Sequence, residues 1–256
     1  MNTRINELLK AMPAVTLDEM THLGLMDRMD SKYLAPVSLL PRLLEEMNRL
    51  FRVQVINGAS LSAYSTQYLD THALDMYLMH QNGKLNRQKV RIRSYVESGV
   101  SFLEIKNKNN KGRTSKRRIP VHCSCLQSMS DLADAKLFLD ANALFRSEDM
   151  KPALSNRFRR LTFVNRKAAE RVTVDLSLSF HNHRTGRDAM LEQLMILELK
   201  QDSRRRSDFR DILHRAGIKP VSFSKYCMGT VLTDPHVKYN RFKSRWTAIN
   251  KIMDNY

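Results

Sequence analysis

"KVRIRSY", residues 89–95, places a cation at every second position with an apolar residue between. Successive side chains of a β-strand point to opposite faces, so Lys89, Arg91 and Arg93 share one face while the valine and isoleucine between them point into a core. Like charges set opposite one another across strands are destabilising. The stretch therefore leaves two interpretations of the charged face: exposure to solvent, or binding of an anionic ligand.

Composition narrows the class of ligand. The chain has 256 residues, enough to bury a substantial core, and we expect a single domain over residues 1–256. Its formal net charge of +17 favours association with nucleic acid, an acidic membrane surface or phosphate-rich substrates. Charge alone does not choose among these three.

The cysteines and the hydropathy pattern indicate a cytoplasmic protein. Cys123, Cys125 and Cys227 are an odd number, and no second pair or nearby histidines stand at metal-ligand spacing, which favours reduced thiols. No stretch approaches the roughly 20 apolar residues of a membrane span. Residues 1–25 contain no apolar run that resembles a signal peptide.

The pattern along the chain predicts an α+β fold with an antiparallel sheet flanked by helices. Turn signals separate short alternating runs, and helical spacing of apolar residues flanks them. The turn signals lie at residues 82–84, 97–101 and 107–115. Helices are predicted within 1–25, 38–51, 125–145 and 207–220, and a second set of strands at about 158–165, 170–180 and 193–201.

The two sets of strands echo each other. In each set a charged alternating strand precedes an apolar strand that carries Glu-x-Lys, namely Glu104 with Lys106 and Glu198 with Lys200. Arg171, Thr173 and Asp175 alternate in the same way, as do Lys116 and Arg118. At least five strands therefore carry charges on one face, and most of these charges are positive.

Three structures would explain such a face. A barrel with the charges inside would be a basic tunnel, in which a glutamate could bind Mg²⁺ or Mn²⁺ together with substrate phosphates. A nucleic-acid-binding sheet would present its cations outward with aromatic rings for stacking, yet these strands carry few such rings. An ordinary solvated sheet is the third. The residues by themselves leave the three open.

Seven segments resemble, in order, the VTC domain, the polyphosphate polymerase module of the vacuolar transporter chaperone complex and its bacterial relatives. They are "DSKYL" at 30–34, "YLDT" at 68–71, "HQNGKLNRQKVRIRSY" at 80–95, "FLEIKNK" at 102–108, "RVTVDL" at 171–176, "LELK" at 197–200 and "FSKYC" at 223–227. The resemblance covers about residues 25–230. It implies the antiparallel β-barrel of the triphosphate tunnel metalloenzymes, the CYTH-like superfamily, with an N-terminal helix and a basic C-terminal tail outside the core.

The resemblance also implies a reaction and a set of site residues. The reaction is metal-dependent transfer of the γ-phosphate of ATP to a growing polyphosphate chain, with Mn²⁺ or Mg²⁺ as cofactor. Glu198 is then the metal ligand. The catalytic cations are Lys32, Arg91, Arg93, Lys106, Arg160, Arg171, Lys200 and Lys225, and the further substrate-binding residues are Lys89, Glu104, Lys116 and Arg118.

One departure from the superfamily pattern bears on the activity. The first strand of the superfamily usually begins with Glu-x-Glu-x-Lys, whereas this chain has Arg28, Asp30 and Lys32. Fewer carboxylates favour the VTC branch over hydrolytic relatives. If water attacks instead of a phosphate chain, the same tunnel is a triphosphatase, and a non-catalytic polyphosphate-binding module is a further alternative.

Some roles stay open. Glu104 could serve a second metal or orient water, or it could form a structural salt bridge, while Asp175 is expected to pair with tunnel cations. Asp70 is expected to cap a turn or to order a basic residue. The predicted partners are ATP and polyphosphate, with a separate membrane protein as a further partner and no nucleic acid.

Overall fold

The computed structural model describes residues 3–21, 28–122, 133–167, 170–202 and 206–254. The α-helices are α1 (Thr3–Ala11), α2 (Leu17–Thr21), α3 (Leu40–Met47), α4 (Asp75–Gln81), α5 (Ala133–Asn142), α6 (Asp208–Arg215), α7 (Lys225–Thr233) and α8 (Lys243–Asp254). The strands are β1 (Ala14–Val15), β2 (Arg28–Pro36), β3 (Phe51–Gln54), β4 (Leu61–Thr71), β5 (Arg87–Tyr95), β6 (Val100–Lys108), β7 (Thr114–Val121), β8 (Met150–Asn165), β9 (Glu170–Asn182), β10 (Asp188–Leu191) and β11 (Leu194–Asp202). Short 3₁₀ turns are η1 (Val37–Leu39), η2 (Val96–Ser98), η4 (Ser147–Asp149) and η5 (Asn240–Phe242).

One large sheet dominates the part of the chain described. Its main order is β2-β11-β9-β8-β4-β5-β6-β7, with every neighbouring pair antiparallel. Strand β10 pairs with β9, and β3 joins β8 and, in parallel, β1. The predicted α+β class with an antiparallel sheet is confirmed. Strand β8 is longer than predicted, because it begins at Met150 instead of near residue 158.

Helices cover the outer face of this sheet in two places. Helices α1, α3 and α6 pack on β2, β8, β9 and β11, around buried residues such as Leu44, Phe163 and Phe209. Helix α5 and part of α4 cover β5 and β6, where Ile92 and Leu103 are fully buried. Much of the apolar half of the period-two pattern thus forms these two cores, and the charged half lies on the opposite face. That face also holds a third core, in which α7 and α8 pack on Leu154, Phe180 and Ile196.

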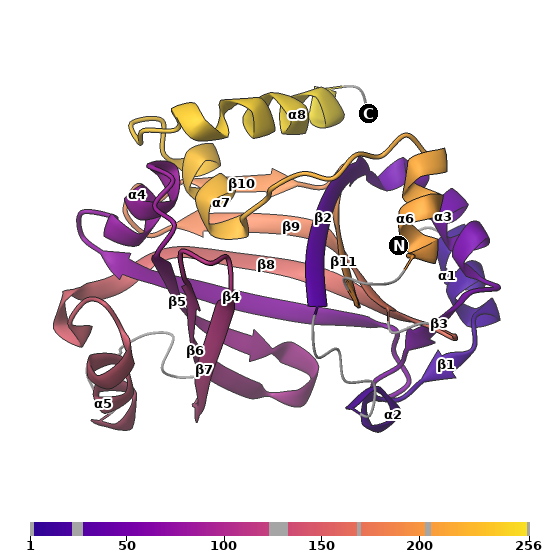
Figure 1. Cartoon of the computed structure of the whole chain (residues 1–256), viewed down its shortest axis with the longest axis horizontal. Coiled ribbons are helices and arrows are strands. Elements are labelled where there is room, and N and C mark those ends of the chain that lie inside the picture. The colour runs from indigo at the N-terminus through magenta and orange to yellow at the C-terminus, as the bar shows by residue number, and fades with distance from the viewer. Residues whose placement is uncertain (1–2, 22–27, 123–132, 168–169, 203–205, 255–256) are drawn as a thin grey trace.

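The sheet curls around that opposite face, which we call the concave face. Lys32 of β2 donates to the carbonyl of Phe223 at 3.0 Å, and Lys89 of β5 donates to the hydroxyl of Ser224 at 2.9 Å. Four strands separate β2 from β5 in the sheet, yet their lysines reach consecutive residues. In Figure 1, β2 accordingly passes in front of the central strands. Within the described residues no ladder joins β2 to β7, so strand pairing does not close the predicted barrel there. The segment before α7 instead contacts both Lys32 and Lys89.

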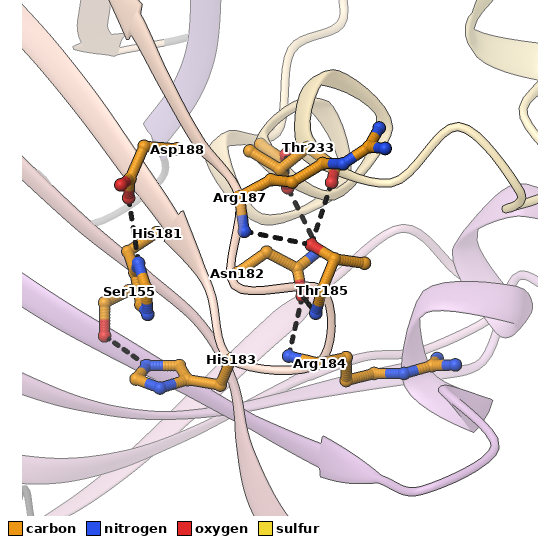
Figure 2. A network of polar contacts seen from close by, with 10 residues as sticks. Ser155, His181, Asn182, His183, Arg184, Thr185, Arg187, Asp188 and Thr233 are labelled. Carbon is orange, nitrogen blue, oxygen red and sulfur yellow. Dashed lines mark hydrogen bonds and ion pairs between the residues drawn. The ribbon is translucent and has the colours of Figure 1, made fainter.

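Helix α7 lies against the concave face and is fixed at both ends. At its start Ser224 caps the amide of Cys227, and the Tyr226 hydroxyl donates to Asp70. At its end the Asn182 amide donates to the Thr233 hydroxyl at 3.0 Å. Figure 2 shows this second anchor, where Thr185 also donates to the Thr233 carbonyl. The first residue of α7 is therefore held firmly in place over the sheet.

The structure also bears on the C-terminal tail, the cysteines and the hydropathy pattern. Most of the basic C-terminal tail forms helix α8. Cys227 is a free, buried thiol, whereas Cys123 and Cys125 lie outside the described residues. In the described part of the chain, no helix is long and apolar enough to cross a membrane.

Candidate functional site

The strand register brings every predicted site residue to the concave face. Residues paired across antiparallel strands point to the same side, so each ladder can be followed from strand to strand. From β7 to β4 the rungs are Lys116–Lys106–Lys89 and Arg118–Glu104–Arg91–Tyr68, with Arg93 beside Thr66. From β8 to β2 they are Arg160–Asp175, Thr173–Glu198–Lys32 and Arg171–Lys200–Asp30. Lys225 joins them from α7 through Asp175.

The balance of charge on this face is strongly positive. Along the described ladders, the eleven predicted cations outnumber the carboxylates of the same face, which include Asp30, Glu104, Asp175, Glu198 and Asp202. Cations gathered so densely repel one another, and a bound polyanion would relieve that repulsion. The arrangement therefore favours a phosphate-rich ligand over water.

Glu104 is held by two of these cations. Its carboxylate accepts from Arg91 Nε at 2.8 Å and Nη2 at 2.7 Å, and it pairs with Lys116. The side chain is 1% exposed. Burial alone would raise the pKa of Glu104, but Arg91 and Arg93 lower it to about 2. The structural salt bridge is thus the role that its contacts support, and the metal or water-orienting role has no support among them.

Asp175 plays the matching part on the other wall. It accepts from Arg160 Nε at 2.5 Å and Nη2 at 2.8 Å, and it pairs with Lys225. Burial opposes ionisation, yet Arg160 and Lys225 hold the pKa of Asp175 at about 2. The predicted pairing of Asp175 with tunnel cations is confirmed. Asp175 links β8, β9 and α7 through one carboxylate.

Glu198 differs from both, because among the described residues a single ion pair holds it. Lys200 Nζ lies 3.1 Å from Glu198 Oε1, and the glutamate side chain is 18% exposed. Burial opposes ionisation, but Lys200, Lys32 and Arg160 keep the pKa of Glu198 well below its ordinary value. Glu198 is therefore a charged carboxylate with access to a ligand.

The donor set around Glu198 fits a hard divalent cation. The described residues contain no group of three or more acidic, histidine or cysteine side chains that could hold a metal ion. Mg²⁺ needs only one or two carboxylates when phosphates and water supply the other oxygens. Thr173, opposite Glu198, also has a buried hydroxyl without a protein partner. A metal held by Glu198 would thus depend on the bound phosphate.

The lysines near α7 have lowered pKa values. Burial lowers the pKa of Lys89 to about 8, and the charge of Lys32 adds to the effect. Burial likewise lowers the pKa of Lys225 to about 8, although Asp175 opposes the shift. An anion bound here would restore their full charge, since a nearby negative charge favours the protonated amine.

The structure adds a row of polar groups that the sequence did not indicate. Thr66 lies between Arg93 of β5 and Asn156 of β8, and all three point to the concave face. The Thr66 hydroxyl, both polar atoms of the Asn156 amide and Arg93 Nε are buried, and they have no hydrogen-bond partner in the part of the chain that the structure describes. Such groups are rare in native structures and indicate a bound water or ligand. Only the strand register places these three side chains together, because they come from three different strands.

Asp70 was also underestimated from the sequence. It accepts from the amides of Thr71, Met76 and Tyr77 at 2.8–3.0 Å, so it caps α4 as the turn-capping prediction required. It also binds the Tyr226 hydroxyl, next to Lys225. The two quoted motifs "YLDT" and "FSKYC" are thus joined in space, and Asp70 positions the start of α7.

Comparisons with known proteins agree with this geometry. Residues 27–233 match the family model described as the VTC domain. The fold is similar to that of a Bacillus halodurans protein provisionally named an adenylate cyclase, with a TM-score of 0.52 and 12% identity over 77% of this chain and 94% of that chain. It is also similar to a Hippeastrum protein described as having a dominant triphosphatase activity, with a TM-score of 0.50 and 13% identity over 80% and 96%. No curated protein matches the sequence. The structural likenesses show the CYTH-like tunnel fold.

Proposed function

Because the chain belongs to the VTC domain family, we propose that it is a metal-dependent polyphosphate polymerase that transfers the γ-phosphate of ATP to a growing polyphosphate chain. The observation that carries the proposal is the set of cations that the ladders gather on the concave face, on β5, β6 and β7 at one side and on β8, β9, β11 and β2 at the other. A chain of phosphates is a polyanion that could contact both groups of cations at once.

The residue types suit phosphoryl transfer. Catalysis of this reaction is mostly positioning and electrostatic stabilisation, since charge spreads over the equatorial oxygens of the transferred group. Arginines offer planar, bidentate contacts, and lysines act as point charges. Glu104 and Asp175 hold Arg91 and Arg160 in fixed orientations, so these two cations are preorganised.

The metal would be held by Glu198 and by the phosphates of the substrate. When bound, a divalent cation neutralises phosphate oxygens and orients the leaving diphosphate. Lys200 and Lys32, on either side of Glu198 along β11 and β2, would hold the same phosphates from the protein side. We expect Mn²⁺ or Mg²⁺, because both prefer oxygen ligands.

The transfer needs no protein nucleophile. The terminal phosphate of the growing chain attacks the γ-phosphate of ATP and ADP leaves. In this proposal ATP and polyphosphate are the partners that the site binds. A membrane protein that receives the product and a cytoplasmic location remain predictions.

Triphosphate hydrolysis is the second candidate, and one observation favours it. Lys106, Lys116 and Arg118 are exposed, so the β6–β7 side of the concave face is open to solvent. Water that enters there could attack the γ-phosphate in place of a phosphate chain. The two reactions share the cations and the metal and differ only in the nucleophile.

The test is incubation of the purified protein with ATP and Mn²⁺ or Mg²⁺. Products are resolved on a gel stained for polyphosphate while ADP and free phosphate are assayed in parallel. Long chains with ADP establish the polymerase, free phosphate without chains establishes a triphosphatase, and neither product leaves a binding module. Glu198→Gln should lower turnover about 10²–10³-fold, the scale on which loss of one transition-state contact acts. The exposed Glu192→Gln is the matched control and should leave turnover unchanged.

A further inference from the structure

The two ends of the β5–β6–β7 wall differ in chemistry. At one end the concave rungs are Arg87–Lys108 and Lys89–Lys106–Lys116, which contain only cations on β5 and β6. At the other end they are Arg93–Phe102–Pro120 and Tyr95–Val100. The concave face thus runs from a cationic end to an end that is largely apolar.

Four rings make up what we call the aromatic end: Tyr64, Tyr95, Phe102 and Phe158. Tyr64 stacks on the buried Phe158 with centroids 5.1 Å apart and planes 8° from parallel. Tyr95 lies 5.1 Å from Tyr64 and 6.2 Å from Phe102. The rings therefore form one connected cluster along the concave face.

Two of the rings extend beyond the core. Phe158 is buried in the core under α7 and Tyr64 packs against that core, whereas Tyr95 and Phe102 lie outside it and are half-buried. The neighbouring Val100 is 41% exposed. Apolar surface grouped on a concave face, next to charged residues, is typical of a ligand site. A polyphosphate chain offers these half-buried rings no apolar group to contact, whereas a nucleotide offers them a planar base.

Cations of the phosphate site are interleaved with these rings. The guanidinium of Arg160 lies 5.0 Å from the Tyr64 centroid, that of Arg93 lies 6.0 Å from it, and that of Arg118 lies 4.3 Å from the Phe102 centroid. A ligand with phosphates on these arginines would carry its next group over the rings. A nucleoside triphosphate has this composition, with a planar base joined to a phosphate chain.

We propose that the aromatic end binds the nucleobase of the phosphate donor, so that the donor's phosphates point from Arg93 toward Lys89 and Lys106. This inference rests on the proposed function of the concave face as a triphosphate site. Stacking on rings accepts every base, because every base has a π-face. The donor site should therefore discriminate a nucleotide from an inorganic triphosphate and only weakly one base from another.

The experiment compares two ligands that share a triphosphate but differ in the base. Isothermal titration calorimetry measures binding of ATP and of inorganic tripolyphosphate to the wild-type protein, to Phe102→Leu and to Tyr95→Leu. Loss of one stacking ring should weaken the affinity for ATP about ten-fold and change the affinity for tripolyphosphate by no more than about two-fold. Leucine keeps the site apolar, which limits damage to folding, and thermal unfolding of each variant checks this.

Tyr239→Leu is the matched control. Tyr239 is 37% exposed, and its ring contacts Trp246, away from the concave-face ladders. The affinity for either ligand should therefore stay unchanged. Equal loss of ATP and tripolyphosphate in the two test variants, or no loss of ATP, overturns the nucleobase site. Wild-type binding of tripolyphosphate without tighter binding of ATP also overturns it while leaving the triphosphate site intact. A wild-type protein that binds neither ligand contradicts the proposed function itself.

Discussion

Arg159 and Arg160 are adjacent in β8 but lie on opposite faces of the sheet. Arg159 pairs in register with Ala63 and Leu176 on the outer face and is exposed. Arg160 is 12% exposed on the concave face and is held by both oxygens of Asp175. A charge on the outer face is hydrated, whereas a charge on the concave face is ordered by protein partners and surrounded by other cations.

The difference teaches what the concave face is built to do. Carboxylates there, Glu104 and Asp175, are each shared between two cations, so they orient the cations without neutralising the face. The outer face instead buries apolar residues under helices. The same period-two alternation therefore produces packed cores on the outer side and, on the concave side, a preorganised group of cations next to the core under α7 and α8.

Substitution of Asp175 should remove the ordering of the concave-face cations, and it should have the largest effect on stability. Asp175→Asn leaves Arg160 and Lys225 without their buried partner, and loss of one member of a buried ion pair costs about 3–5 kcal/mol. Urea unfolding measures the change in free energy. Asp188→Asn is the control, because that carboxylate is 72% exposed beside His181 and should change stability by less than about 0.5 kcal/mol. Equal effects would show that Asp175 is not needed to hold the cations.

Acid should weaken the same ion pairs without a mutation, because it protonates the carboxylates. The folded-state pKa values of Glu104 and Asp175, each about 2, lie below ordinary carboxyl values near 4. Both groups therefore stabilise the fold fully above about pH 4, and this stability is lost as the pH falls toward about 2. Circular dichroism melts from pH 6 to about 2 measure it. Asp175→Asn should flatten the profile, and an unchanged profile would contradict the assignment.

Alkaline pH should weaken anion binding at the concave face, with a smaller effect than the two changes above. Lys89 and Lys225 have pKa values of about 8 because they are buried, so they lose charge as the pH rises above about 8. Tripolyphosphate affinity should fall several-fold between about pH 7 and 9.5, and binding near pH 8 should take up protons. Calorimetry in two buffers of different ionisation enthalpy detects the uptake. Affinity that stays constant over this range would contradict a role for these lysines.

The sequence predicts the faces of this sheet well, because alternation is local. The split between Arg91 or Arg93 and Ile92 follows from the period of a strand, and the resemblance named the cations that the ladders bring to one face. The capping role of Asp70 was likewise expected. These features depend on neighbours along the chain.

What the sequence could not predict depends on partners far along the chain. The ion pair of Glu104 with Lys116 depends on the neighbouring strand β7, so the sequence left the role of Glu104 open. The polar row through Thr66 and Asn156 forms only when β4 and β8 pair in register. Helix α7 was not predicted either, and its position depends on Tyr226 meeting Asp70, 156 residues apart in the sequence. Pairings of this kind are fixed by tertiary packing.

The most direct test of the concave face as the anion site compares two arginines by calorimetry with tripolyphosphate. Arg93 is on the concave face and has a buried Nε without a protein partner, so Arg93→Gln removes a ligand contact without breaking an ion pair. Arg159→Gln removes the same charge from the outer face. We predict that Arg93→Gln weakens binding about ten-fold or more, as expected for a charged hydrogen bond of about 1.5–3 kcal/mol, and that Arg159→Gln stays within about two-fold. Equal loss in both variants would contradict the account, because net charge alone would then attract the anion.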